Sequence, residues 1–307
     1  MAFSIYDYKG VIPAMMTPFK ADNTFDKAAA REMVDWMISQ GSSGFYLTGS
    51  NGSGPYMESK ERNEVVETMM EAINGRVPAV AHIAFVSPTV SAQMAKHAKS
   101  VGCTGISGVP GYYFHLSPDE MYRYYSEIAE ATDLPLLVYA MTHLYTPSVE
   151  MFQKLSKIPN VKGVKYTGPD HYMMGRIKEH LGKDFLVYSG RDEQFLSGVL
   201  CGVDGIIGGS YNLLPDLYAR AIDELWAGKV KEAQKDMLAA NAILEALFPY
   251  DFNAAMRACL GFIGVNAGLN PTPMRRLDND EKAHLKKDLQ ELKAKLDIAP
   301  IALFDAI

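Results

Sequence analysis

The sequence has few cysteines and no long apolar run. Its three cysteines, Cys103, Cys201 and Cys259, are too far apart for a paired-cysteine zinc motif and too few for a disulfide framework. No segment offers the roughly 20 apolar residues that span a membrane. The N-terminal segment carries Asp7 and Lys9 where a signal peptide needs an apolar stretch. We therefore expect a protein of a reducing compartment, located in the cytoplasm.

Runs of basic residues are also missing. The 307 residues include 30 Lys and Arg against 36 Asp and Glu, so the net charge is −6. This balance excludes the positive footprint that phosphate backbones require, and we expect no nucleic-acid or membrane partner. None of the seven histidines has a metal-ligand spacing, so no metal and no organic cofactor is predicted. Hydrophobic residues make up 48% of the chain, enough for a full core.

Short apolar runs bounded by Gly, Pro or Asn alternate with stretches whose apolar residues recur at spacings of three and four. Several runs are apolar at nearly every position, which is typical of parallel strands covered on both faces. The pattern predicts an α/β fold, a (β/α)8 TIM barrel, with a doubly wound sheet as the alternative. The eight predicted strands are Val11–Met16, Gly44–Leu47, Ala79–Phe85, Gly105–Val109, Leu134–Met141, Val161–Tyr166, Phe185–Tyr188 and Gly205–Ile207.

After Gly208 the pattern contains helices alone. The first of them, Leu213–Trp226, closes the eighth unit. The helices that follow exceed what a barrel needs, so we predict a catalytic barrel over residues 1–228 and a C-terminal helical extension over residues 229–307.

Reacting groups of a TIM barrel lie at the carboxyl ends of its strands. Near the end of the sixth predicted strand, Lys165 shares one strand face with Thr167. If that face is the barrel interior, burial disfavours the ammonium and lowers its pKa, which makes the amine a nucleophile for a carbonyl. The alternative is a lysine paired with a carboxylate at the barrel rim.

Other strand ends carry polar groups. Tyr139, on the fifth strand, is a candidate proton relay, although a lone strand tyrosine is usually a packing residue. The glycine-rich loop Thr48–Gly54 suits a small anion or is merely a tight turn. In Gly190-Arg191-Asp192-Glu193, the two carboxylates either bind substrate hydroxyls or only favour a helix N-terminus.

Taken together, these motifs resemble the pyruvate-dependent Schiff-base aldolases, the family of dihydrodipicolinate synthase and N-acetylneuraminate lyase. The similarity runs from Pro13–Phe19 through the loop at Gly49, Tyr139, Gly163–Lys165 and Gly190–Glu193 to Gly208–Asn212. Each motif is weak alone, and their combination is specific.

The resemblance implies a role for each matched residue. Lys165 is the Schiff-base lysine and Tyr139 the proton relay. The family's carboxylate-binding loop falls on Gly49-Ser50-Asn51-Gly52-Ser53, where Ser50 and Asn51, together with Tyr113, help to seat the carboxylate and complete the relay. A tyrosine that enters a neighbouring subunit's site matches Tyr113, which implies a homo-oligomer, usually a tetramer. Thr167 lines the pocket, and Gly190, Asp192 and Glu193 belong to a segment that binds sugar-acid hydroxyls.

The same resemblance implies reversible cleavage of N-acetylneuraminate to N-acetylmannosamine and pyruvate. Dihydrodipicolinate synthases carry an arginine shortly after the strand-five tyrosine, and Ala140–Ser148 has none. Departures from the lyase pattern are Asn51, Ser53, Ala140 and Gly209, and Arg191 stands where lyases often have an uncharged residue. Alternatives are another 2-keto-acid aldolase of the 4-hydroxy-2-oxoglutarate type, dihydrodipicolinate synthase, or a sugar-acid binding module without turnover.

Overall fold

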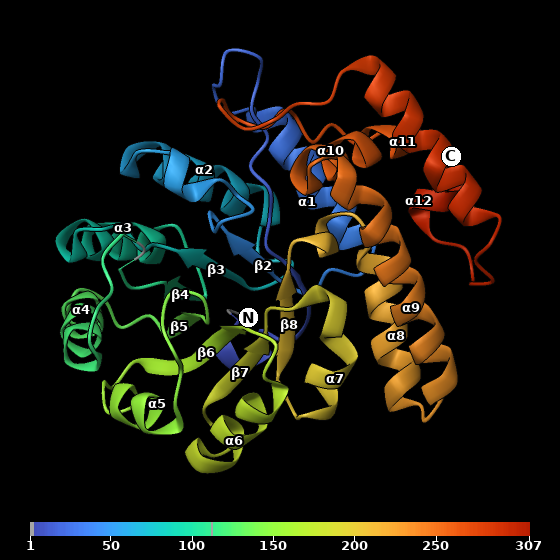
Figure 1. Ribbon diagram of the computed structural model, residues 1–307. Helices are drawn as coiled ribbons and strands as arrows, with labels where there is room; N and C mark the ends of the chain where they lie inside the picture. The colour runs from blue at the N-terminus through green and yellow to red at the C-terminus, as the bar shows by residue number, and fades with distance from the viewer. Residues whose placement is uncertain (1–2, 112) are drawn as a thin grey trace.

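The computed structural model describes residues 3–111 and 113–307. Eight parallel strands form its centre (Figure 1). They pair in the order β1-β8-β7-β6-β5-β4-β3-β2, and a parallel bridge between Ala14 and Tyr46 joins β1 to β2. The predicted TIM barrel is therefore confirmed. The strands are β1 (Gly10–Pro13), β2 (Phe45–Leu47), β3 (Ala79–His82), β4 (Gly105–Gly108), β5 (Leu136–Met141), β6 (Val161–Thr167), β7 (Leu186–Ser189) and β8 (Gly205–Gly208).

A helix follows each strand and covers the outside of the barrel (Figure 1). Several begin with a serine whose side chain accepts a hydrogen bond from the first turn, as Ser87 and Ser117 do, followed by a proline that cannot donate one. The helices are α1 (Lys27–Ser39), α2 (Ser59–Ile73), α3 (Pro88–Ser100), α4 (Pro118–Glu130), α5 (Val149–Leu155), α6 (His171–Leu181), α7 (Phe195–Leu200) and α8 (Pro215–Trp226).

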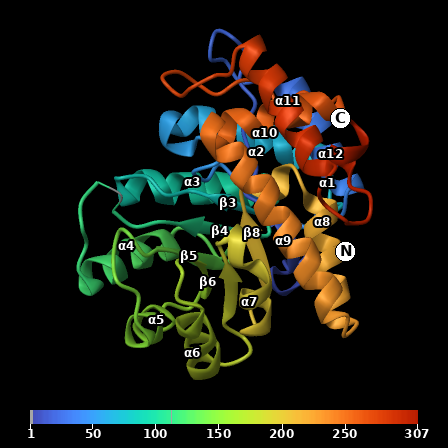
Figure 2. The same cartoon turned by 45° about the vertical axis from the view of Figure 1, so that its right-hand side comes forward.

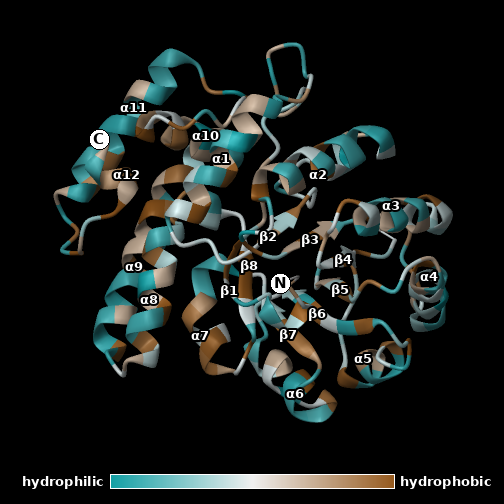
Figure 3. Cartoon of the chain, turned by 180° about the vertical axis from the view of Figure 1, so that it is seen from behind, coloured by the Kyte–Doolittle hydropathy of each residue, from teal (hydrophilic) through white to brown (hydrophobic). Residues whose placement is uncertain are grey.

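The apolar core has two layers. One lies between the strands and the helices, whose hydrophobic stripes face inward (Figure 3). The other fills the inside of the barrel and includes Tyr8, Ile12, Leu137 and Tyr188. Because the interior is filled by side chains, the barrel has no through-channel, and only the carboxyl ends of its strands are free to form a site.

Four more helices follow the barrel: α9 (Val230–Leu247), α10 (Phe252–Ile263), α11 (Asn279–Lys293) and α12 (Ala302–Asp305). In Figures 1 and 2, α9 runs beside α8, and α10 to α12 gather on the side of α1. Asn241 of α9 donates a hydrogen bond from Nδ2 to the carbonyl oxygen of Glu193 at 3.0 Å. The extension is thereby fastened to the loop after β7. Within the described residues, no helix has both the length and the apolarity needed to cross a bilayer.

Candidate active site

A cavity of about 310 Å³ opens at the carboxyl ends of the strands. Seven residues singled out from the sequence meet there, from the loops and ends of β2, β5, β6 and β7. They are Asn51, Tyr139, Lys165, Thr167, Gly190, Asp192 and Glu193. Residues far apart in the chain thus converge on one space, as the strand-end argument predicts.

Lys165 occupies the centre of this arrangement. It lies opposite Tyr139 in the register of β5 and β6, and only 4% of the residue is exposed. Its Nζ is 4.1 Å from the ring centroid of Tyr46 and 4.3 Å from that of Tyr139. No carboxylate of the described chain forms an ion pair with it, so the alternative of a rim salt bridge is wrong. The amine faces two aromatic rings and the cavity.

Below Lys165 lies a buried polar cluster. The hydroxyl of Tyr46 donates to Ser107 Oγ at 3.0 Å, and the His82 ring centroid is 6.0 Å from that of Tyr139. Arg62 hydrogen bonds to the His82 Nδ1 atom at 3.2 Å. Burial, followed by the charges of Arg62 and Lys165, holds the pKa of His82 well below 6.5. His82 is therefore neutral at physiological pH and adds no second positive charge beside the amine.

Asp192 is tied to the start of the loop after β8. Its Oδ2 atom accepts hydrogen bonds from the backbone N–H and the hydroxyl of Ser210, both at 2.7 Å. A Cβ atom on Gly208 would come within 1.8 Å of Asp192 Oδ1, so only glycine fits beneath this carboxylate. Burial raises the pKa of Asp192, and the two bonds from Ser210 oppose that rise.

Glu193 and Arg191 flank Asp192 in the lining of the cavity. Among the described residues, neither side chain forms an ion pair, and the Arg191 Nε atom is buried without a hydrogen-bond partner. Asp192 is partly committed to Ser210, whereas these two groups are free for a ligand. The mouth of the cavity therefore offers both an acceptor for hydroxyls and a cation for a carboxylate.

Two departures from the lyase pattern meet each other in space. A Cβ atom on Gly209 would come within 2.8 Å of the Asn51 Nδ2 atom and 3.0 Å of its Oδ1 atom. The Asn51 amide thus occupies the space that a side chain at position 209 would need. The two departures therefore form one local change, in which the Asn51 side chain of the β2 loop fills the space beside Gly209.

Three predicted residues do not line the cavity. Gly49 is buried behind it, where a Cβ atom would come within 2.8 Å of the Tyr46 ring, and Ser50 is exposed on the loop after β2. Tyr113 is 78% exposed, with its ring centroid 4.8 Å from that of Phe114. Tyr112 lies outside the described residues. Among the described residues of the β4 loop, none lines the cavity within one chain.

The sequence reasoning missed the contribution of the extension. Leu244 of α9, Phe252 of α10 and Phe248 between them line the cavity. Helical periodicity places Leu244 on the apolar face of its helix, but the neighbouring sequence does not indicate what that face packs against. His82 is a single polar residue in the apolar run Ala79–Phe85, and its position there does not indicate a role. Among the described residues, no group of three or more His, Cys, Asp or Glu could hold a metal ion.

Comparisons with known proteins agree with this geometry. Residues 7–292 match the model of the dihydrodipicolinate synthetase family. An N-acetylneuraminate lyase of Rhizobium meliloti is 31% identical over 282 residues, covering 91% of this chain and 93% of that protein. The wild-type sialic acid aldolase of Ruminococcus gnavus has a TM-score of 0.90 at 28% identity, covering 95% of this chain and 100% of that one.

A dihydrodipicolinate synthase from Bacillus anthracis is also similar, with a TM-score of 0.86 at 28% identity over 92% of this chain and 98% of that chain. Because both activities occur at comparable similarity, the comparisons give the family and its class of chemistry, not the substrate. The chain belongs to the dihydrodipicolinate synthetase family and is a Schiff-base aldolase, a carbon–carbon lyase.

Proposed function

We propose that the enzyme cleaves N-acetylneuraminate reversibly to N-acetylmannosamine and pyruvate, with Lys165 as the Schiff-base residue. The observation that carries this proposal is the buried amine of Lys165, which faces the cavity without a carboxylate partner. The names of the curated relatives favour the sugar acid as substrate. Glu193 and the remaining oxygen of Asp192 would accept hydrogen bonds from the hydroxyls of the sugar chain.

The reaction follows from the positions of two residues. The lone pair of the Lys165 Nζ atom attacks the keto carbon, Tyr139 donates a proton to the hydroxyl of the resulting carbinolamine, and loss of water gives a protonated imine. The bond between the carbons α and β to the imine carbon then breaks, and its electron pair moves toward the imine to form an enamine. Tyr139, whose ring faces Lys165, takes the proton of the reacting hydroxyl and returns a proton to the enamine carbon. Water then releases pyruvate from Lys165.

Other polar groups would seat the keto acid. Asn51 and Thr167 line the cavity, and the Thr167 hydroxyl is buried without a hydrogen-bond partner within the described chain. We assign these two groups, with the loop at Gly49 and Ser50, to carboxylate binding, and Gly190 to the segment that binds the sugar-acid hydroxyls. Asn51, whose amide fills the space beside Gly209, would supply one of these contacts.

A second candidate is cleavage of a shorter keto acid with two carboxylates, such as 4-hydroxy-2-oxoglutarate. Arg191 favours it, because its Nε atom is buried at the cavity without a partner in the described residues. Guanidinium groups pair well with carboxylates.

Pyruvate release from the two substrates decides between these candidates. We expect kcat/KM to be higher for N-acetylneuraminate, and Glu193→Gln to lower it about tenfold, because the negative charge and one of the two acceptor oxygens are lost. If 4-hydroxy-2-oxoglutarate is preferred and Arg191→Gln abolishes that preference, the second candidate replaces the first. Release of pyruvate from neither substrate contradicts both.

We also propose a homotetramer in the cytoplasm, with a barrel over residues 1–228 and an extension that closes its mouth. Tyr113 and Phe114 are 78% and 62% exposed, as expected for side chains that enter a neighbouring subunit. The cysteines Cys103, Cys201 and Cys259 are all free thiols, which suits a reducing compartment. Light scattering on the purified protein measures the mass, and a monomer that cleaves substrate at full rate contradicts the shared site.

A further inference from the structure

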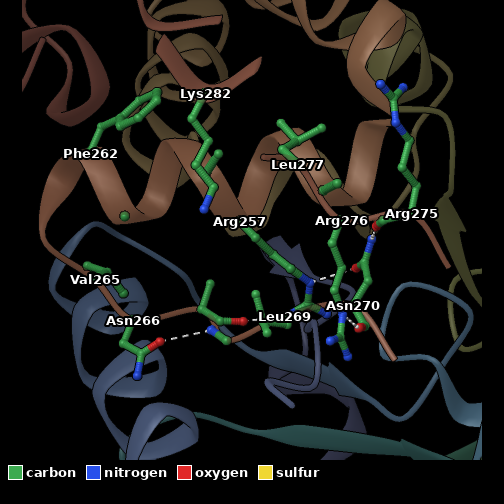
Figure 4. A pocket seen from close by; sticks show the side chains of 15 residues that line it. Arg257, Phe262, Val265, Asn266, Leu269, Asn270, Arg275, Arg276, Leu277 and Lys282 are labelled. Atoms are coloured by element: carbon green, nitrogen blue, oxygen red, sulfur yellow. Dashed lines mark hydrogen bonds between the residues drawn. The ribbon is translucent and has the colours of Figure 1, made fainter. Parts of the chain in front are cut away.

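A second cavity lies outside the barrel, between α10, residues 264–278 and the first turn of α11 (Figure 4). Its volume is about 320 Å³. No acidic side chain lines it within the described residues, although the chain as a whole has a net charge of −6. Four basic residues line it: Arg257, Arg275, Arg276 and Lys282.

Arg257 is buried in the floor of this cavity with only 6% of its surface exposed. Its Nε atom donates to Asn270 Oδ1 at 2.7 Å, and its side-chain nitrogens also donate to the carbonyl oxygens of Thr17, at 3.0 Å, and of Ala267. All of these acceptors are neutral. The hydrogen bonds hold the guanidinium in place, but no carboxylate of the described chain neutralises its charge.

Arg276 approaches the same asparagine from its backbone side. Its Nε atom donates to the Asn270 carbonyl oxygen at 2.7 Å, and a terminal nitrogen donates to Asn23 Oδ1 at 2.8 Å. Both guanidinium groups thus contact Asn270 and neutral acceptors only. Burial and then the charge of Arg276 lower the pKa of Arg257 to about 10, as expected for two cations without a shared anion.

Lys282 supplies a third positive charge. Figure 4 shows its side chain extending from α11 toward the cavity, and it forms no ion pair within the described chain. Nearby acids are engaged elsewhere. Glu281 pairs with Arg275, and Glu32 accepts a hydrogen bond from the backbone N–H of Asn266 at the rim.

We propose that this cavity binds a small, multiply charged oxyanion, either a phosphate group or the carboxylates of a polycarboxylic acid. Arg257, Arg276 and Lys282 would share its charge, since guanidinium forks match both groups. Apolar side chains in the wall, Phe262 and Leu277 among them, leave room for a carbon skeleton beside the charged group. The site lies outside the barrel mouth and does not depend on the proposed substrate.

Calorimetric titration of the full-length protein tests the proposal, with sodium phosphate and sodium citrate as separate probes and ionic strength held constant with sodium chloride. We expect saturable binding of at least one probe. Comparison of the affinities for phosphate and citrate shows whether the cavity takes a phosphate group or the carboxylates of a polycarboxylic acid. Lys282→Gln should weaken that binding about tenfold, since it removes one charged contact. Lys287→Gln, on the same helix and paired with Glu291 instead of lining the cavity, is the matched control and should leave it unchanged.

Lys282 makes no side-chain hydrogen bond in the described chain, so its variant should fold. Arg276→Gln is a second test, read by affinity and not by stability, because it also loses bonds to Asn23 and Asn270. Lys165→Ala should bind the anion as the wild type does. The proposal is wrong if neither probe binds at millimolar concentration, if both lysine variants on α11 behave alike, or if Lys165→Ala abolishes binding.

Discussion

Two buried cations, in two parts of the molecule, have opposite surroundings. Lys165 in the barrel mouth faces the aromatic rings of Tyr46 and Tyr139. Arg257 of α10 donates hydrogen bonds to acceptors at Thr17, Ala267 and Asn270. The exposed fractions are nearly equal, 4% and 6%, so burial alone does not separate the two sites.

The two side chains differ in the interactions that their charged groups make. The amine of Lys165 forms no ion pair within the described residues and remains free to attack a carbonyl. A guanidinium keeps its charge, so it needs fixed acceptors and attracts an anion. The barrel mouth therefore suits covalent chemistry at Lys165. The cavity beside α10 suits stabilisation of the fold by Arg257 and recognition of an anion.

Removing the amine is the largest expected change. Lys165→Ala should lower kcat/KM for aldol cleavage by about 10⁴-fold or more, because the covalent step has no other nucleophile in the cavity. The unfolding midpoint should change little, since no ion pair is lost. Steady-state kinetics and thermal melting measure the two quantities.

The matched control is Lys162→Ala, on the same strand but outside the cavity. It should retain nearly wild-type kinetics. Comparable losses of kcat/KM in Lys165→Ala and Lys162→Ala would mean that a disturbed β6 strand, and not the missing amine of Lys165, causes the loss.

The relay is the next largest effect. Tyr139→Phe keeps the ring beside Lys165 and removes only the hydroxyl, and we expect kcat to fall about 10²–10³-fold. Formation of the imine should persist, because the nucleophile is intact. Retention of full kcat would leave Tyr139 with a packing role.

At the other cation, stability should change and chemistry should not. Arg257→Met leaves buried oxygens of Thr17, Ala267 and Asn270 without their donor, at a cost of about 3 kcal/mol of unfolding free energy. Urea unfolding measures this loss. Arg275→Met, at an exposed ion pair with Glu281, is the control and should cost less than about 1 kcal/mol.

The smallest effect concerns pH. Folding lowers the pKa of His82, so below about pH 6.5 the unfolded chain binds more protons and stability falls as pH decreases. His82→Gln retains an acceptor for Arg62 but cannot titrate. Relative to this variant, the wild type should lose at most about 2 kcal/mol between about pH 6.5 and pH 5. Parallel stability curves for the two proteins would exclude a neutral, buried His82.

Much of the fold was predictable because its signals are local. Apolar runs such as Leu134–Met141 mark a strand wherever the chain goes, and the alternation with helices permits few arrangements. The side-chain alternation of β6 put Lys165 on one face with Thr167, and both residues line the cavity in the structure. These predictions required no knowledge of distant contacts.

Contacts between segments far apart in the chain could not be predicted from the sequence. Nothing near Leu244 or Phe252 indicates that they close the barrel mouth, and the fit of Asn51 against Gly209 joins residues from opposite ends of the barrel sequence. Arg257 is equally cryptic, because its acceptors at Thr17 and Ala267 carry no side-chain signal. Every residue has a backbone carbonyl, so residue type does not indicate which one accepts a hydrogen bond from Arg257.

Trapping of the imine tests the central claim most directly. The protein is incubated with pyruvate, reduced with borohydride and digested, and the peptides are analysed by mass spectrometry. We expect one reduced pyruvate adduct on the peptide that contains Lys165, and none in Lys165→Ala. An adduct on another lysine, or one that persists in Lys165→Ala, would contradict it.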